Sequence, residues 1–132
     1  GFTFAFVSIV VFDMIDGKVG AWTFITALAY GLLGLWAGVY FKNKKSNSWS
    51  YAKFAIMGTL AFDIATGLSV GPLFFGQPFM EALIGQIPFT AMHLAGNVGF
   101  AILLSPLIYK YVTENKKLET SYILKTINPK SI

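Results

Sequence analysis

Four polar side chains share one face of the last long apolar stretch of the chain, which runs from Gln86 to Tyr111. Their offsets of zero, four, seven and eleven place Gln86, Thr90, His93 and Asn97 in one stripe along a helix. In hydrocarbon such groups are stable only where they face protein, water or a ligand. The stripe therefore marks the side of the helix on which something is bound or packed, and it carries the chain's single histidine.

A second polar face is expected on the preceding apolar stretch, where Thr59, Asp63 and Thr66 recur at helical spacing. The rise of a helix, about 1.5 Å per residue, would bring Asp63, His93 and Asn97 to a similar depth. Three interpretations of such a meeting are open: a hydrogen-bonded network between helices, a ligand pocket, or a proton or cation relay.

Other kinds of chemistry have weak support in the sequence. One histidine and one carboxylate are too few for a metal, which usually has three or four protein ligands. The chain has no cysteine, which excludes thiolate catalysis and disulfides, and no arginine for a bidentate clamp on phosphate. We expect no catalytic residue, no metal and no cofactor.

The composition indicates an all-α, polytopic membrane bundle. Of the 132 residues 55% are hydrophobic and 12% are charged, against roughly 25% charged in a soluble domain. Residues 1–112 hold four apolar segments, at about 1–15, 21–41, 52–71 and 86–112, and residues 113–132 form a polar tail. The first segment is short for a bilayer and is expected to begin in the middle of a helix.

The second segment carries small residues at offsets of zero, four, seven and eleven, which are Ala27, Gly31, Gly34 and Gly38. Small side chains let membrane helices approach closely. Because the face has no polar group to specify a separate partner, we expect it to pack against another helix of this chain.

The lysines predict the orientation of the segments in the membrane. All ten basic residues are lysine, and most of them cluster after the second segment and at the end of the chain. By the positive-inside rule these regions are cytoplasmic, which makes the chain a multi-pass plasma-membrane protein with a cytoplasmic C-terminus. The net charge of +4 then reflects topology and does not indicate nucleic-acid binding.

The connections on the other side should face outward. Residues 71–85 have no lysine, and Pro78 to Ile84 predicts a short interfacial helix in this outer loop. The turn between the first two segments is expected to hold Gly17 in a turn conformation, with Asp13 capping it or pairing locally with Lys18.

Three features together resemble the substrate-binding S component of energy-coupling factor transporters, over about residues 1–112. They are Asp13 closing one segment, the stretch Trp22 to Gly38, and Ile87-Pro88-Phe89 continuing through His93, Gly96, Asn97 and Pro106. The resemblance implies six membrane helices with both ends cytoplasmic, of which the four segments here would be the last four. It also implies a vitamin-like or nucleoside-like nutrient held in the outer half of the bundle, beneath outer loops.

The resemblance implies partners as well: a coupling membrane subunit and ATPase subunits, with the lipid bilayer around them. The residues that it places in the substrate pocket are Trp22, Tyr30, Asp63, Thr66, Gln86, Thr90, His93 and Asn97. The alternative from another functional class is a structural or assembly subunit, in which the polar stripe only packs against neighbouring helices. Neither interpretation makes the chain an enzyme.

Overall fold

The computed structural model describes residues 1–115, in which every regular element is a helix and no strand is present. The all-α fold class is therefore confirmed for this part of the chain, while residues 116–132 of the expected polar tail lie outside the described residues. The elements are α1 (Phe2–Asp16), α2 (Ala21–Phe41), α3 (Ser48–Gly67), α4 (Val70–Phe75), α5 (Phe79–Leu103), α6 (Ser105–Ile108) and the π-helical turn η1 (Tyr109–Thr113).

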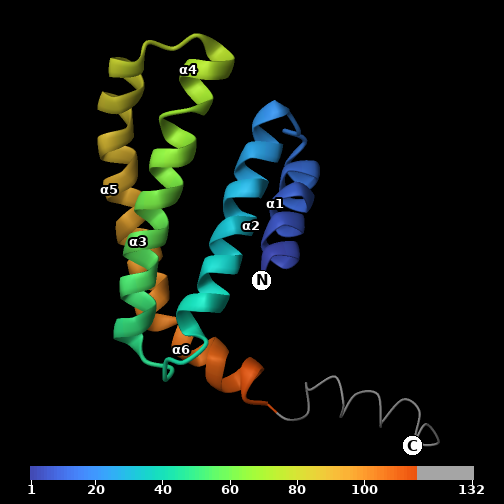
Figure 1. Ribbon diagram of the computed structural model, residues 1–132, viewed down its shortest axis with the longest axis vertical. Coiled ribbons are helices and arrows are strands. Elements are labelled where there is room, and N and C mark those ends of the chain that lie inside the picture. The colour runs from blue at the N-terminus through green and yellow to red at the C-terminus, as the bar shows by residue number, and fades with distance from the viewer. Residues whose placement is uncertain (116–132) are drawn as a thin grey trace, which may run out of the picture.

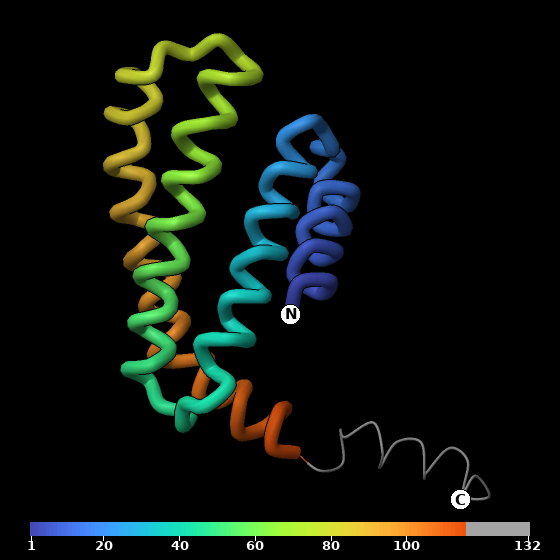
Figure 2. The backbone as a smooth tube through the Cα atoms, viewed as in Figure 1, coloured from blue at the N-terminus to red at the C-terminus, as the bar shows by residue number. Residues whose placement is uncertain are grey.

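The helices form two antiparallel hairpins, which are visible in Figure 1. The most extensive contacts join α1 to α2 and α3 to α5, and α2 also contacts α3. The short helix α4 lies in the connection between α3 and α5, at the end opposite to the loop that joins α2 to α3 (Figure 1). Figure 2 shows the chain turning away from the axis of α5 where α6 begins.

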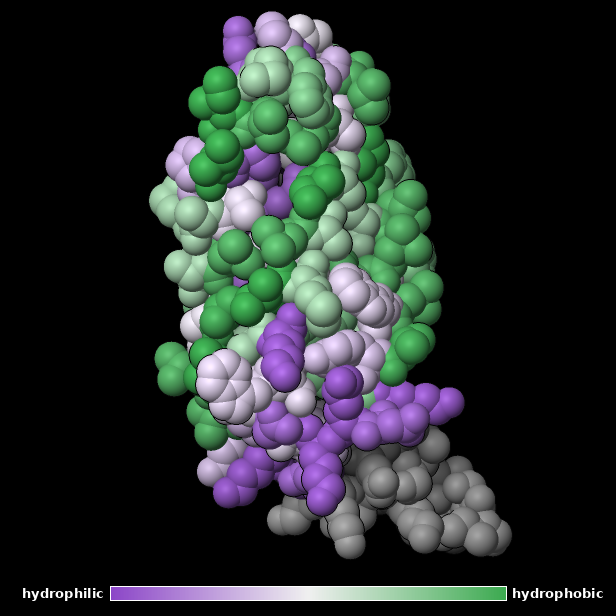
Figure 3. All heavy atoms as spheres, turned by 60° about the vertical axis from the view of Figure 1, so that its left-hand side comes forward, coloured by the Kyte–Doolittle hydropathy of each residue, from purple (hydrophilic) through white to green (hydrophobic). Residues whose placement is uncertain are grey.

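Three helical stretches are long and apolar enough to cross a bilayer: Ala21–Phe41, Ser48–Phe75 and Phe79–Thr113. Helix α1, with 15 residues, is about 22 Å long and falls short of a hydrocarbon core of about 30 Å. Figure 3 shows hydrophobic surface over most of the visible face, with hydrophilic residues gathered toward the end where α6 lies. These features indicate a membrane protein.

The outer loop differs from its sequence prediction. Pro78 to Ile84 is not a separate interfacial helix, because Pro78 is the N-cap of α5 and the helix continues without a break through Pro88. Pro88 lacks an N–H group and removes one backbone hydrogen bond, a defect that membrane helices tolerate. The helix within the loop is instead α4, which ends at Gly76 in a left-handed conformation with φ 63°.

The small-residue face of α2 packs against α1, as expected. Ala27 is fully buried, and a Cβ added at Gly31 would lie 2.6 Å from the ring of Phe2. A Cβ at Gly34 would lie 2.6 Å from the backbone oxygen of Gly1. Gly38 is the exception on this face, since nothing lies within 4 Å of the position where its Cβ would be.

The turn between α1 and α2 holds Gly17 at φ 69°, in agreement with the prediction, but its side-chain pairs differ. Lys18 pairs with Asp16, at 2.6 Å between Nζ and Oδ2, and not with Asp13. Asp13 instead accepts a hydrogen bond from the hydroxyl of Thr23, which is only 1% exposed. A buried hydroxyl needs a hydrogen-bond partner more than an exposed lysine does, and this explains why Asp13 bonds to Thr23 and not to Lys18.

Candidate functional site

The polar stripe of α5 faces α3 and is bonded to it at two levels. The Nδ1 of His93 lies 2.8 Å from Oδ1 of Asp63, and Asn97 donates from Nδ2 to Oγ1 of Thr59, also at 2.8 Å. The structure thus brings Asp63 and His93 together, as their helical positions predict. Asn97 lies one turn further along α5 and meets Thr59, one turn back along α3, because the two helices run antiparallel.

Asp63 is the most unusual group in this contact. Its side chain is 1% exposed, and its second carboxylate oxygen, Oδ2, has no hydrogen-bond partner among residues 1–115. A buried carboxylate is costly unless it is paired and hydrogen-bonded on both oxygens. The Oδ2 atom is therefore a buried acceptor without a donor among residues 1–115.

The polar groups at the other end of the stripe form their hydrogen bond within α5. Gln86 donates from Nε2 to the hydroxyl of Thr90 at 3.1 Å, so these two residues bond along α5 itself. The amide of Gln86 lies directly against Gly67 of α3, where an added Cβ would overlap it. Gly67 thus lets the amide approach the backbone of α3, but this part of the stripe makes no side-chain hydrogen bond to α3.

A first cavity, of about 330 Å³, lies where α2, α3 and α5 meet. Polar groups of Thr59, His93 and Asn97 line it together with the rings of Tyr30 and Phe62. The centroids of the Tyr30 and Phe62 rings are 4.6 Å apart, at an angle of 59°. The cavity therefore combines the surfaces of two tilted aromatic rings with a small number of polar groups, which is typical of sites for small organic ligands.

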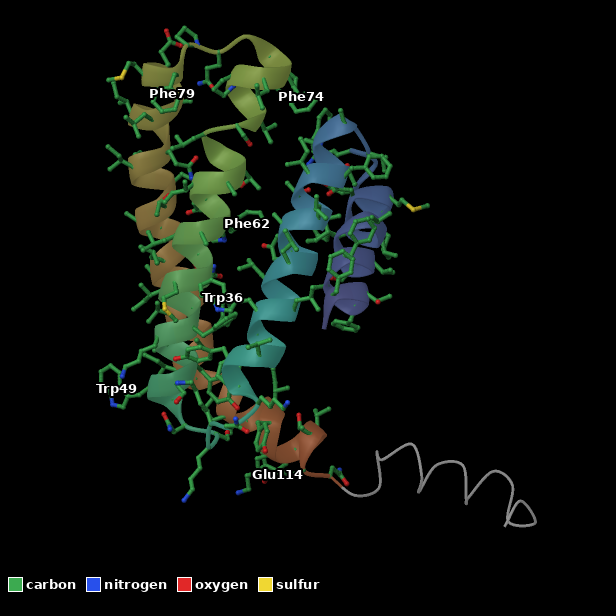
Figure 4. The ribbon with its side chains drawn as sticks, viewed as in Figure 1. Trp36, Trp49, Phe62, Phe74, Phe79 and Glu114 are labelled. Atoms are coloured by element: carbon green, nitrogen blue, oxygen red, sulfur yellow. The ribbon has the colours of Figure 1, made fainter. Side chains whose placement is uncertain are left out.

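A second cavity, of about 350 Å³, lies closer to α4. Trp22, Thr66 and Gln86 line it, and Phe62 lines it as well, so Phe62 lies between the two cavities. Figure 4 shows Phe62 in the space between α3 and α2. Trp22 also approaches Phe75 of α4, with ring centroids 6.1 Å apart.

The eight residues expected in one pocket are therefore divided by the structure. Tyr30, His93 and Asn97 line the first cavity, whereas Trp22, Thr66 and Gln86 line the second. Asp63 and Thr90 line neither cavity: Asp63 is buried between α3 and α5 and bonded to His93, and Thr90 is bonded to Gln86.

Phe62 is the main site residue that sequence reasoning missed. It contacts Tyr30, and its ring centroid lies 6.1 Å from that of His93. A phenylalanine in an apolar helix carries no signal that distinguishes it from the many phenylalanines that face lipid. Only its position immediately before Asp63 could have directed attention to it.

The site offers two of the side chains that metals prefer, Asp63 and His93. Within residues 1–115, no group of three or more histidine, cysteine or acidic side chains gathers in a way that could hold a metal ion. Since metals in proteins usually take three or four protein ligands, hydrogen bonding and aromatic packing are the chemistry that this site supplies.

Comparison with protein-family models, with curated proteins and with solved structures finds no match for this chain. The function of the chain therefore has to follow from the chemistry of these residues. That chemistry has three parts: a buried carboxylate with one free oxygen, an imidazole bonded to it, and an aromatic cavity beside them.

Proposed function

We propose that this chain is a membrane subunit that binds a small nutrient, vitamin-like or nucleoside-like, for uptake across the plasma membrane. The observation that carries the proposal is the 330 Å³ cavity, in which His93 and Asn97 lie beside the rings of Tyr30 and Phe62. Ligand pockets typically enclose about 300 to 1,000 Å³, with mostly apolar linings and a few polar groups that set orientation.

In this proposal the two cavities have different roles. The rings of Tyr30 and Phe62 pack against the ligand in the first cavity, and the polar atoms of His93 and Asn97 orient it. The second cavity, next to α4 and lined by Trp22, is the entry from outside. Phe62 lies between them, and a ligand that passes from one cavity to the other displaces its ring.

The resemblance to S components of energy-coupling factor transporters suggests the partners with which the chain assembles. The chain then works with a coupling membrane subunit and with ATPase subunits that hydrolyse ATP, and it is not itself an enzyme. Release of the nutrient inside the cell requires the first cavity to open toward the cytoplasm.

The proposed topology has four membrane segments, with α1 as part of a membrane segment and both the α2–α3 loop and the C-terminus cytoplasmic. The chain has no cysteine, so single cysteines can be introduced without background. We expect Asn43→Cys to react with an impermeant maleimide only from the cytoplasmic side and Gln77→Cys only from outside. Both positions are exposed. Labelling of the two from the same side would contradict the topology.

The proposed function is tested by native mass spectrometry of the full chain released from lipid nanodiscs. We expect one small molecule to accompany each chain, and Asn97→Leu to reduce its occupancy at least about tenfold, because it removes a polar group that lines the cavity. Asn43→Leu is the matched control, since it makes the same substitution in an exposed loop. A folded wild-type protein that carries no molecule would contradict the proposal.

A structural or assembly subunit is the second candidate, and one observation favours it. The bonds from His93 to Asp63 and from Asn97 to Thr59 join α3 to α5 directly, as packing contacts would. If packing were their whole role, substitutions at these positions would reduce stability and leave no ligand to lose. Stability and ligand occupancy must therefore be measured on the same variants.

A further inference from the structure

Asn97 and His93 offer hydrogen-bond acceptors to the first cavity, beside the hydroxyl groups of Tyr30, Thr59 and Ser105, which can donate or accept. Asn97 donates one N–H of its amide to Thr59 and keeps its carbonyl oxygen, Oδ1, as an acceptor for a ligand. His93 uses Nδ1 to bond Asp63, so a neutral ring that donates there presents the lone pair of Nε2. Asp63 lines neither cavity, and its buried Oδ2 has no hydrogen-bond partner among residues 1–115, so its carboxylate lies behind His93.

The ionisable groups beside the first cavity are a carboxylate and an imidazole, with Oδ1 of Asp63 and Nδ1 of His93 2.8 Å apart. Among residues 1–115 no lysine lines either cavity, and Lys53 lies on a different groove, next to Tyr40. The whole chain has no arginine. An anionic ligand would thus enter a low-dielectric site without a counter-charge, which is unfavourable.

The aromatic lining favours positive charge as well. The faces of aromatic rings attract cations, and the attraction grows where water is excluded. Tyr30 and Phe62 lie 4.6 Å apart between centroids and form adjacent walls of the cavity. Phe62 immediately precedes Asp63 in the chain, so the ring surface and the carboxylate belong to the same turn of α3.

We infer that the nutrient held in the first cavity is an aromatic cation, a flat ring that bears a positively charged nitrogen group with N–H donors. This inference rests on the proposed function and names its substrate class. The ring packs against Tyr30 and Phe62, its donors bond to Asn97 and His93, and its charge is balanced by Asp63 behind His93. Carboxylates and phosphates of the same size bind more weakly than such a cation.

Three probes of nearly the same shape test the sign of the charge: benzamidine is a cation, benzamide is neutral and benzoate is an anion. The full chain in nanodiscs of uncharged phosphatidylcholine is titrated with each probe, and dissociation constants are measured by ligand-observed NMR. We expect benzamidine to bind at least about tenfold more tightly than benzoate, with benzamide between them.

Two variants test whether the preference for benzamidine over benzoate arises from Asp63 and the first cavity. Asp63→Asn should reduce the ratio between benzamidine and benzoate to less than about threefold, because it removes the charge and keeps the shape. Asn97→Leu should weaken benzamidine and benzamide together, since both donate to its carbonyl. If Asp63→Asn does not fold, the dissociation constants of the three probes for the wild-type protein still show whether the site prefers a cation.

The outcomes separate this inference from the proposed function. Benzoate binding as tightly as benzamidine, or more tightly, would overturn the cationic class while leaving a ligand site in place. Equal weakening of all three probes by Asp63→Asn would also overturn it. If none of the three binds, the cationic class is wrong, and the proposed function then stands only if native mass spectrometry finds a molecule of another class.

Discussion

Replacing His93 with leucine is expected to destabilise the folded protein by about 3 kcal/mol, the largest effect that we predict for a single side chain. The substitution removes the one side chain among residues 1–115 that is bonded to Asp63, which is 1% exposed and has a second oxygen without a partner in the same part of the chain. The carboxylate can take up a proton, and this keeps the loss near the lower end of the range for broken buried pairs. Reversible unfolding in mixed detergent measures the change.

The double variant Asp63→Leu/His93→Leu should recover most of this loss. Buried ion pairs can often be replaced by apolar side chains at little cost, so we expect a free energy of unfolding within about 1 kcal/mol of the wild type. Thr66→Val is the control on the same face, because its hydroxyl bonds only to the backbone carbonyl of Phe62 in its own helix. A double variant that is as unstable as the sum of the two single variants would contradict the coupling.

Gly34→Val is expected to separate α1 from α2 and to destabilise the N-terminal hairpin by about 1 to 3 kcal/mol. The added Cβ would lie 2.6 Å from the backbone oxygen of Gly1 and 3.1 Å from the Cβ of Ala5. Backbone atoms cannot rotate away as a long side chain can, so the two helices must move apart. Distances between spin labels on α1 and α2 measure the separation.

Gly38→Val is the matched control for this prediction. It makes the same substitution in the same helix, and nothing lies within 4 Å of the new Cβ. We expect the stability and the distance between α1 and α2 to remain close to those of the wild type. Equal losses from both substitutions would mean that helix propensity, and not close packing, accounts for the effect at Gly34.

The polar contact between α3 and α5 could be predicted from the sequence because it depends on local geometry. Helical periodicity places His93 and Asn97 on one face, and the rise per residue sets Asp63 opposite to His93. The packing of Gly31 and Gly34 against α1 follows from small side chains in the same way. Both predictions use the spacing of residues along helices, and the first also compares the depths of two helices in the membrane.

The division into two cavities could not be predicted in this way. It depends on the ring of Phe62 and on how α2 lies against α3, and neither is encoded in the spacing within a helix. The start of α5 also differs from its prediction. The sequence predicts a short helix from Pro78 to Ile84 in an outer loop, whereas α5 begins at Phe79 and continues through Pro88, which a membrane helix tolerates.

The ligand occupancy of the Asp63→Leu/His93→Leu double variant tests the central claim most directly, because it separates binding from packing. The full chain and the double variant are purified in parallel, and bound small molecules are quantified by native mass spectrometry. We predict a folded double variant that has lost the molecule carried by the wild type. A folded double variant that retains the same molecule at the same occupancy would contradict the assignment of this site.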